Sequence, residues 1–371
     1  MRCVEAKNIE KLDMNRNNYC IIMAGGVGGR FWPMSTPSCP KQFLDLLGTG
    51  ETMLQTTVKR FEQVCPQENI FVVTGIQYKN LVKEQIPYLQ DYQIVCEPSR
   101  RNTAPCIAYA GVTIKQINPQ ANIIVSPSDH AIFDTEKFTR LMKEGLSVSA
   151  EHDWIITFGI EPTSPNTKYG YIQFNENSSL PTGCNLHKVI TFTEKPPFDM
   201  AQQFIRSGDF LWNSGIFIWN IKTMEESFNK YLPDVYEAFN SVTLATPYST
   251  IENIYSLSQS ISIDYGVIEK ASNVHVMIAD FGWSDVETWA SLYETRNKDI
   301  YGNTISGDNV VTYDVKNSVI HVPKNKKVIL QGLENYIVAE SDGVLMICNR
   351  NSEHRIFKFA SDMEMKSKNN K

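Results

Sequence analysis

The chemistry-bearing feature nearest the start of the chain is a glycine-rich turn that follows an apolar run. Segment 21–30 reads IIMAGGVGGR, and Lys41 follows Arg30 after a short interval. Glycines let backbone N–H groups approach an oxyanion closely, because no Cβ blocks the way. Arg30 and Lys41 would add two positive charges at the same mouth. The pattern predicts a loop that holds a polyphosphate, and therefore a chain that handles a nucleotide.

Two common nucleotide-binding loops can be excluded by their spacing. The dinucleotide fingerprint places a third glycine three residues after the second. Counted from Gly26 and Gly28, that place is taken by Phe31. The P-loop ends in Gly-Lys-Ser or Gly-Lys-Thr, whereas residues 29–31 read GRF. A dinucleotide-dependent oxidoreductase is therefore disfavoured.

Two aspartates follow segments that read as strands. Asp129 comes after the apolar run Asn122–Ser126, and Asp285 comes after the alternating run Val274–Ala279. Ligands of open parallel sheets bind beyond the carboxyl ends of the strands. Mg²⁺ takes one or two protein carboxylates together with substrate phosphates. The pair suits such a site, although Asp129 as a turn cap and Asp285 as a helix start remain open alternatives.

Three further blocks suit a sugar phosphate. Residues 192–196 read FTEKP, in which Glu194 can accept hydrogen bonds from sugar hydroxyls and Lys195 can meet a phosphate as a point charge. Gly170 in YGYI would let a sugar ring lie against the backbone, and Asn213 in LWNSGIF places an amide beside aromatic walls. An ordinary surface ion pair and ordinary core tryptophans are the competing interpretations.

Composition bounds the class of protein. A chain of 371 residues suits one large domain plus a smaller one. The net charge of −6 gives no reason to expect nucleic acid or an anionic membrane as a partner. Eight scattered cysteines without a Cys-x-x-Cys pair favour free thiols in a reducing compartment. No apolar stretch reaches the length of about 18 residues that a membrane span needs, and no secretory signal opens the chain. We expect a cytoplasmic protein.

Short apolar runs alternate with helical patterns over most of the chain. Strands are predicted at Cys20–Ala24, Ile70–Thr74, Gln93–Cys96, Asn122–Ser126, Trp154–Ile160 and His187–Thr193, and helices at Met53–Cys65, Tyr78–Leu89, Ala104–Gln116, Thr135–Ala150 and Pro197–Ser207. This alternation predicts an α/β fold with a mostly parallel central sheet. From about Tyr301 only short strands are expected, without a convincing helix, which indicates a small separate β domain.

The ordered blocks resemble the signature of the sugar-nucleotide pyrophosphorylases, most closely their mannose-1-phosphate guanylyltransferase branch. The resemblance rests on GGVGGRFWPMS at residues 25–35, PKQF at 40–43, RNTAP at 101–105, and the SPSDH, YGYI, FTEKP, WNSG and WSD blocks. It covers about residues 19–295. Phe31 and Met34 stand where the family usually has leucines. Thr36 stands where a basic residue often follows the serine, which removes one possible phosphate contact.

The resemblance implies a particular organisation of the fold. An extension of residues 1–18 would precede a catalytic domain of residues 19–295, built on a Rossmann-like, GT-A-like mixed but mostly parallel sheet flanked by helices. Residues 296–360 would form a small C-terminal β domain, a short left-handed β-helix. Residues 361–371 would be a disordered tail.

The resemblance also implies the transfer of GMP from GTP to α-D-mannose 1-phosphate, with GDP-mannose and pyrophosphate as products and Mg²⁺ assisting an in-line attack. The catalytic residues would be Arg30, Lys41, Asp129 and Lys195, and the metal ligands Asp129 and Asp285. The sugar-phosphate site would consist of Gly170, Glu194, Lys195 and Asn213. The nucleotide would meet Ala24, Gly25, Gly26, Gly28, Gly29, Arg30, Glu97, Asn102, Thr103 and Ser128. Asn102 or Thr103 could instead be a simple helix N-cap.

Two other functions remain open at this point. One is the same chemistry with another hexose 1-phosphate and UTP or dTTP, since the preference for guanine rests on the resemblance alone. The other is a non-catalytic nucleotide sensor, although such a protein would have no need to keep Lys41 and both aspartates. Family members commonly pair as dimers, which implies a homodimer here.

Overall fold

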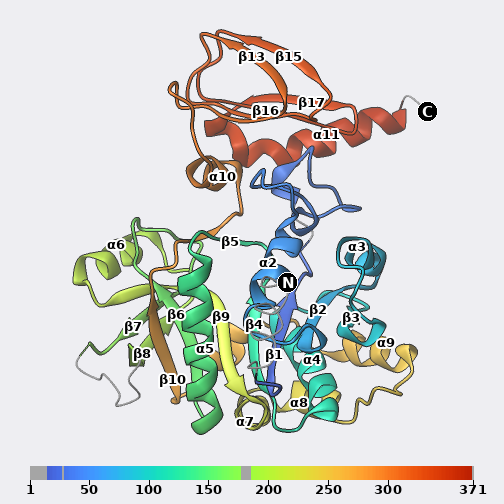
Figure 1. The fold of residues 1–371 in the computed structure, drawn as a ribbon, viewed down its shortest axis with the longest axis vertical. Coiled ribbons are helices and arrows are strands. Elements are labelled where there is room, and N and C mark those ends of the chain that lie inside the picture. The colour runs from blue at the N-terminus through green and yellow to red at the C-terminus, as the bar shows by residue number, and fades with distance from the viewer. Residues whose placement is uncertain (1–14, 27–28, 177–184, 370–371) are drawn as a thin grey trace, which may run out of the picture. The chain divides into compact units, whose positions relative to one another are not determined.

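The computed structural model of the protein describes residues 15–26, 29–176 and 185–369, and Gly28 and residues 1–14 lie outside this part (Figure 1). The chain separates into two units. Unit 1 contains residues up to Gly25, Thr57–Ser128 and Ile132–Trp283. Unit 2 contains Gly26–Thr56, Asp129–Ala131 and Ser284 onward. The division differs from a single boundary at residue 295, because Gly26 and Lys41 belong with the C-terminal strands.

Unit 1 is built on a mixed sheet whose described strands run in the order β3-β2-β1-β4-β9-β6-β10-β8-β7. These strands are β1 (Asn18–Met23), β2 (Ile70–Gly75), β3 (Ile94–Glu97), β4 (Asn122–Pro127), β6 (Ile155–Ile160), β7 (Tyr171–Phe174), β8 (Leu186–Thr193), β9 (Phe210–Asn220) and β10 (Val274–Ala279). β7 also pairs back onto β9, so the order closes on itself at that strand.

The expectation of a mostly parallel sheet is wrong. Only β1, β2, β3 and β4 on one side, and β6 with β10 on the other, pair in parallel. The pairs β4–β9, β6–β9, β7–β8, β7–β9 and β8–β10 are antiparallel. The physical reason is β9, a mostly buried strand of eleven residues that enters between β4 and β6 in the opposite direction. Its apolar pattern gives no information about direction.

The strand directions bring distant residues to one edge of the sheet in unit 1. Because β9 is antiparallel to both β4 and β6, the carboxyl ends of β4 and β6 point the same way. Asn213, near the start of β9, pairs with Gly159 near the carboxyl end of β6. The start of β9 therefore lies at the same edge as the carboxyl ends of β1 to β4, where ligands of α/β sheets bind.

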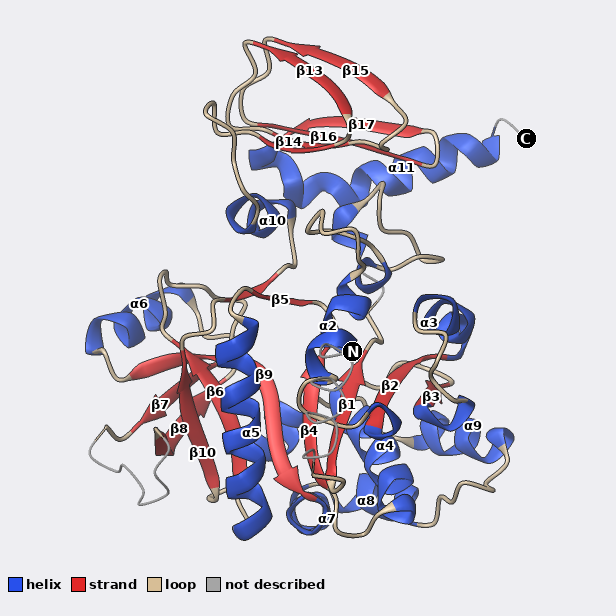
Figure 2. Cartoon of the chain, in the orientation of Figure 1, coloured by secondary structure: helices blue, strands red, loops and turns tan. Residues whose placement is uncertain are grey.

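Helices cover both faces of this sheet (Figure 2). Successive strand residues point to opposite faces: Ile218 packs toward Gly145 of α5 (Thr135–Glu151), while Phe217 and Trp219 join the cluster of the other face. That second face carries α4 (Thr103–Ile117), α7 (Ile221–Tyr231) and α8 (Pro233–Asn240). The other helices among the described residues of the sheet-bearing part are α2 (Met53–Phe61), which begins in unit 2, α3 (Lys79–Gln85), α6 (Phe198–Ser207) and α9 (Tyr248–Leu257).

Unit 2 contains short strands in parallel ladders. β12 (Thr304–Ser306), β14 (Val319–His321) and β16 (Tyr336–Ser341) pair in parallel, and β17 (Val344–Asn349) closes that sheet in the antiparallel direction. β13 (Asn309–Tyr313) pairs in parallel with β15 (Lys327–Gln331). The alternation of strands between two parallel ladders is a coil-like winding of the chain.

The expected disordered tail of unit 2 is instead a helix. α11 runs over Ile356–Asn369, and its first residue, Ile356, is buried in a cluster with Phe31 and Trp289. Because α11 lies beyond Tyr301, the expectation of no helix from that point also fails, whereas Trp289 opens α10 (Trp289–Thr295) inside the expected catalytic region. The charged composition of residues 361–371 concealed the apolar anchor that precedes them. No helix of the described residues is both long enough and apolar enough to span a membrane.

Candidate active site

Lys41 and both predicted metal-binding aspartates come together in unit 2. Lys41 begins a short 3₁₀ turn, and its Nζ lies 2.9 Å from Oδ2 of Asp129 and 3.7 Å from Oδ1 of Asp285. It also donates a 3.0 Å hydrogen bond to the carbonyl of Val286. Asp129 directly precedes β5 (His130–Ile132), Asp285 ends β11 (Trp283–Asp285), and these two strands pair.

Charge explains why this lysine tolerates burial. Its side chain is only 9% exposed, and an unpaired buried ammonium is strongly unfavourable. Burial lowers the pKa of Lys41, but Asp129 and Asp285 outweigh it and raise the pKa above its usual value. Burial raises the pKa of Asp129, but Lys41 and His130 outweigh that effect and leave it below the usual value. Burial leaves the pKa of Asp285 raised.

The helix-start alternative for Asp285 is not observed. The helix that follows Asp285 begins only at Trp289, with Thr288 as its N-cap, so Asp285 is not a helix-start residue.

Arg30 forms an ion pair with Glu287, two residues after Asp285. Glu287 was not singled out from the sequence, and its only signal was its place beside the WSD block. Unit 2 thus groups two cations and three carboxylates.

The described glycines of the turn lie against specific neighbours. In unit 2, Gln42 donates from Nε2 to the carbonyl of Gly26 at 2.8 Å, and a Cβ on Gly29 would lie 2.9 Å from the ring of Phe357. In unit 1, a Cβ on Gly25 would lie 3.3 Å from Oε2 of Glu97. A side chain at position 25 would therefore be in tight contact with the Glu97 carboxylate.

Glu97 is the buried acid of the predicted nucleotide segment. It ends β3, is 6% exposed, and its Oε1 accepts a 3.2 Å hydrogen bond from the hydroxyl of Tyr255. Burial raises the pKa of Glu97 to about 7. Tyr255 was not identified from the sequence, because it lies far along the chain in α9 and reads as an ordinary apolar helix position.

The other predicted nucleotide residues hold local backbone in place. Asn102 is the N-cap of α4, with φ of +67° and its side chain accepting from the N–H of Thr103. The hydroxyl of Thr103 accepts from the N–H of Ile263 at 2.8 Å. The carbonyl of Ala24 accepts from the hydroxyl of Thr74, and the N–H of Ser128 donates to the carbonyl of Met23. The N-cap alternative thus describes Asn102 in this structure.

The four predicted sugar-phosphate residues lie together in unit 1. A Cβ on Gly170 would be 2.5 Å from Oε2 of Glu194 and 3.3 Å from Cβ of Asn213. The N–H of Asn213 donates to the carbonyl of Gly170 at 2.8 Å. Lys195, with φ of +49°, pairs with Glu194, and its side chain is 58% exposed. The group presents one amide, one carboxylate and one accessible ammonium around a glycine.

Sequence reasoning missed one member of this group, Asp264. Its Oδ1 accepts a 3.0 Å hydrogen bond from Nδ2 of Asn213. Burial, and then the neighbouring Glu194 carboxylate, raise the pKa of Asp264 to about 7. The segment SIDYG around it resembles a helix start, and nothing in its spacing connects it to the FTEKP or WNSG blocks.

The donor set in unit 2 fits a divalent cation. Asp129 and Asp285 both face one cation already, the ammonium of Lys41. A hard cation of the Mg²⁺ type takes one or two protein carboxylates and completes its shell with water and phosphate oxygens. Among the described residues there is no group of three or more histidines, cysteines and acids placed to hold a metal by themselves. The arrangement therefore suits an ion that arrives with a phosphate substrate.

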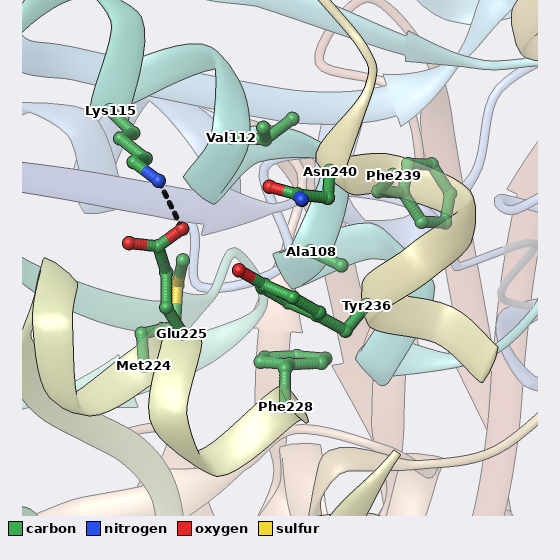
Figure 3. A pocket seen from close by; sticks show the side chains of 9 residues that line it. All are labelled: Ala108, Val112, Lys115, Met224, Glu225, Phe228, Tyr236, Phe239 and Asn240. Atoms are coloured by element: carbon green, nitrogen blue, oxygen red, sulfur yellow. Dashed lines mark hydrogen bonds and ion pairs between the residues drawn. The ribbon is translucent and has the colours of Figure 1, made fainter. Parts of the chain in front are cut away.

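A hollow elsewhere in unit 1 is lined by none of these residues. It lies between α4, α7 and α8, with Met224, Phe228 and Phe239 on its walls and an ion pair between Lys115 and Glu225 at its side (Figure 3). Its aromatic lining belongs to the core cluster of unit 1. The hollow offers no convergent set of phosphate-binding groups.

Comparison with known proteins decides the family. Residues 19–301 match the nucleotidyl transferase family. The chain belongs to this family. It is 33% identical over 356 residues to a mannose-1-phosphate guanylyltransferase of Escherichia coli K12. The aligned region covers 93% of this chain and 73% of the relative. It is 35% identical over 354 residues to the alginate biosynthesis protein AlgA of Pseudomonas fluorescens, covering 92% and 71%.

A solved structure shares the fold of this nucleotidyl transferase. The structure, from Thermus thermophilus, is described as a mannose-1-phosphate geranyltransferase. It superposes with a TM-score of 0.83 at 29% identity, covering 94% of this chain and 99% of that one. The resemblance found in the sequence, the expectation of an enzyme and the α/β fold with helices around a sheet are confirmed.

Proposed function

We propose that this nucleotidyl transferase moves GMP from GTP to α-D-mannose 1-phosphate, with GDP-mannose and pyrophosphate as products. The observation that carries the proposal is the grouping of Lys41 with Asp129 and Asp285 in a chain whose relatives include mannose-1-phosphate guanylyltransferases. The separate grouping of Gly170, Glu194, Lys195 and Asn213 supports the sugar-phosphate half of the reaction. A sensor without catalysis is not favoured, because the relatives are named as enzymes.

The chemistry is an in-line displacement at phosphorus. An oxygen of the sugar phosphate forms a bond to the α-phosphorus of GTP, the bond from that phosphorus to the β-bridging oxygen breaks, and pyrophosphate leaves. No general base is required, since the attacking phosphate monoester is already anionic at neutral pH. Such transfer depends mainly on positioning and charge neutralisation.

The chain's own residues would supply that positioning. Arg30 and the amides of Gly25, Gly26, Gly28 and Gly29 would hold the β- and γ-phosphates, and Lys41 would neutralise charge near the reacting phosphates. Lys195 would fix the incoming phosphate, while Glu194, Asn213 and Gly170 would hold the sugar. A Mg²⁺ ion on Asp129 and Asp285 would supply charge neutralisation to the phosphates when bound.

The buried carboxylate of Glu97 gives a physical reason why the enzyme would select guanine over the other bases. Guanine carries two adjacent hydrogen-bond donors, N1–H and the N2 amino group, and one carboxylate can accept a hydrogen bond from each of them. The other bases lack this pair of neighbouring donors. Glu97 receives its only described hydrogen bond from Tyr255, through Oε1, while Oε2 lies beside Gly25. We therefore assign base recognition to Glu97, with Asn102, Thr103, Ala24 and Ser128 shaping the surrounding backbone.

The same proposal includes the winding of unit 2, the cellular compartment and the oligomeric state. The two parallel ladders of unit 2 would wind as a left-handed β-helix, the enzyme would work in the cytoplasm beside its GTP supply, and two copies would form a homodimer. Light scattering during size-exclusion chromatography measures the last of these directly. A single mass corresponding to one chain of 42.2 kDa would contradict the dimer.

A substrate panel tests the central proposal. Pyrophosphate release is measured with GTP, UTP and dTTP, each with mannose 1-phosphate and glucose 1-phosphate, with Mg²⁺ present and then chelated. GTP with mannose 1-phosphate should give the highest kcat/KM, and chelation should abolish turnover. Lys41→Ala, Lys195→Ala and Asp129→Asn should each lower turnover at least tenfold, a loss of about 1.4 kcal/mol in barrier. Near wild-type rates would refute these role assignments, and preference for UTP or dTTP would refute the guanine assignment.

A further inference from the structure

Asp264 occupies a place in unit 1 that the proposed reaction does not explain. It begins a short π-helical turn, Asp264–Ile268, and is held there by its own backbone, since its carbonyl accepts from the N–H of Glu269 at 3.0 Å. Its side chain points to Asn213, whose Nδ2 donates to Oδ1 of Asp264 at 3.0 Å. A carboxyl group that accepts a hydrogen bond from the side-chain amide of Asn213 can influence the proposed sugar site.

The Asn213 amide is fixed in one orientation by its neighbours. Its Oδ1 accepts from the N–H of Gly215 at 3.2 Å, and from the hydroxyl of Thr157 at 3.1 Å. A backbone N–H can only donate, so the oxygen of the amide must face Gly215. The amide nitrogen must then face Asp264, which is the acceptor it needs because Asn213 is buried. Without Asp264, the amide nitrogen of Asn213 would lose the acceptor that helps to fix the orientation of the side chain.

Asp264 also stands close to the charged groups of the sugar-phosphate residues. Glu194 acts on it through its negative charge and Lys195 through its positive charge. From its own turn, Glu269 reaches the backbone N–H of Glu194, and Tyr265 contributes a phenol near Lys195. An ionised Asp264 would add a carboxylate charge beside those of Glu194 and Glu269, against the ammonium of Lys195, and would disfavour an anionic phosphate monoester.

We propose that Asp264 is a positioning residue of the sugar-phosphate subsite, which locks the Asn213 amide beside Glu194 and sets the charge that the incoming phosphate meets. This inference rests on the proposed function, because it takes the Gly170, Glu194, Lys195 and Asn213 group as the sugar-phosphate subsite. Below about pH 7 Asp264 holds a proton and adds no charge to the subsite. Above that pH Asp264 becomes an anion and makes the subsite more negative by one charge.

Steady-state kinetics on the full chain test the inference. Asp264→Ala removes the acceptor, so the KM for mannose 1-phosphate should rise by about tenfold, the size of effect expected for an unsatisfied buried N–H. The KM for GTP should change by less than about twofold, since no GTP contact is removed. Asp264→Asn keeps an oxygen for Asn213 and cannot ionise. Its KM for the sugar phosphate should lie near that of wild type at pH 6.5.

The pH dependence separates a positioning role from a merely structural one. Between about pH 6.5 and about pH 8.5 the wild-type KM for mannose 1-phosphate should rise at least threefold relative to Asp264→Asn, because only the wild type gains a charge. The ratio of the two enzymes removes the titration of the substrate's own phosphate. Asp234→Asn, an exposed aspartate at the start of α8 in the same unit, is the matched control and should follow wild type.

The outcomes are distinguishable from failure of the proposed function. An active wild type whose KM is unchanged by Asp264→Ala, or whose pH dependence equals that of Asp264→Asn, overturns the inference and leaves the function standing. A wild type that releases no pyrophosphate from GTP and mannose 1-phosphate overturns the function, and the inference with it. If Asp264→Ala does not fold, the comparison of wild type with Asp264→Asn decides alone.

Discussion

Replacement of Lys41 by methionine isolates the charge of this residue from its volume. Methionine fills nearly the same space with a flexible apolar chain, so the main loss is the ammonium between Asp129 and Asp285. Each ion pair is of the order of 4 kcal/mol at about 4 Å and an effective dielectric constant near 20, before desolvation is subtracted. Removing one partner of a buried pair costs about 3–5 kcal/mol, because the other charge is left uncompensated.

The exposure of the partners sets the expected size of the effect. Asp129 and Asp285 keep 22% and 24% of their side-chain surface, so water screens part of the remaining charge. We expect a loss of about 2–3 kcal/mol in the stability of the metal-free protein, below the range for a fully buried pair. Added Mg²⁺ should recover more stability in Lys41→Met than in wild type, since the ion takes the place of the missing charge.

Thermal unfolding with and without Mg²⁺ measures both effects. Lys137→Met is the matched control: Lys137 lies 2.7 Å from Asp280, but their side chains are 40% and 70% exposed, and such surface pairs contribute about 0–1 kcal/mol. The unfolding midpoint should fall by several degrees in Lys41→Met and by at most about one or two degrees in the control. Equal shifts in both variants, or an equal response to Mg²⁺ in wild type and Lys41→Met, would refute the electrostatic reasoning.

Three further predictions test separate parts of the molecule. Gly170→Ala places a Cβ 2.5 Å from the carboxylate of Glu194, so the KM for mannose 1-phosphate should rise about tenfold with little change in the KM for GTP; an unchanged sugar-phosphate KM contradicts the close approach. Glu97→Gln should lower kcat/KM for GTP about tenfold or more. Because the pKa of Glu97 is raised to about 7, wild-type GTP binding should weaken as the pH falls below about 7, and calorimetric titration should show no such trend in the variant. Ile356→Ala should destabilise the protein by about 2–4 kcal/mol in chemical denaturation, whereas Phe357→Ala, at a side chain 56% exposed, should cost much less; equal losses would contradict the anchoring role of α11.

Local structure was largely predictable from the sequence because periodicity is a local property. The helix predicted at Thr135–Ala150 and the strand predicted at Ile70–Thr74 each extend by one residue in the structure. The glycine-rich turn, the FTEKP block and the two aspartates were found because each combines unusual residue types within a few positions. Family resemblance then ordered these blocks along the chain.

The remaining features depend on contacts between residues far apart in the sequence. The partner of Lys41 at Val286, the hydrogen bond from Tyr255 to Glu97 and the approach of Asp264 to Asn213 cannot be deduced from spacing. The reversed direction of β9 has the same origin. An apolar run of strand length fits a sheet in either direction, and only the neighbouring strands decide which one is adopted.

The position of β9 has a consequence for synthesis on the ribosome. β9 spans Phe210–Asn220 and lies between β4 and β6, so the first four strands of the sheet are made long before their neighbour exists. During that interval the edge of β4 that will later pair with β9 has unpaired backbone N–H and C=O groups in the nascent chain. Such exposed edges can pair with strands of other chains. Truncated products that end before residue 210 should therefore be recovered as aggregates or bound to chaperones, while products that extend past residue 280 should remain dispersed.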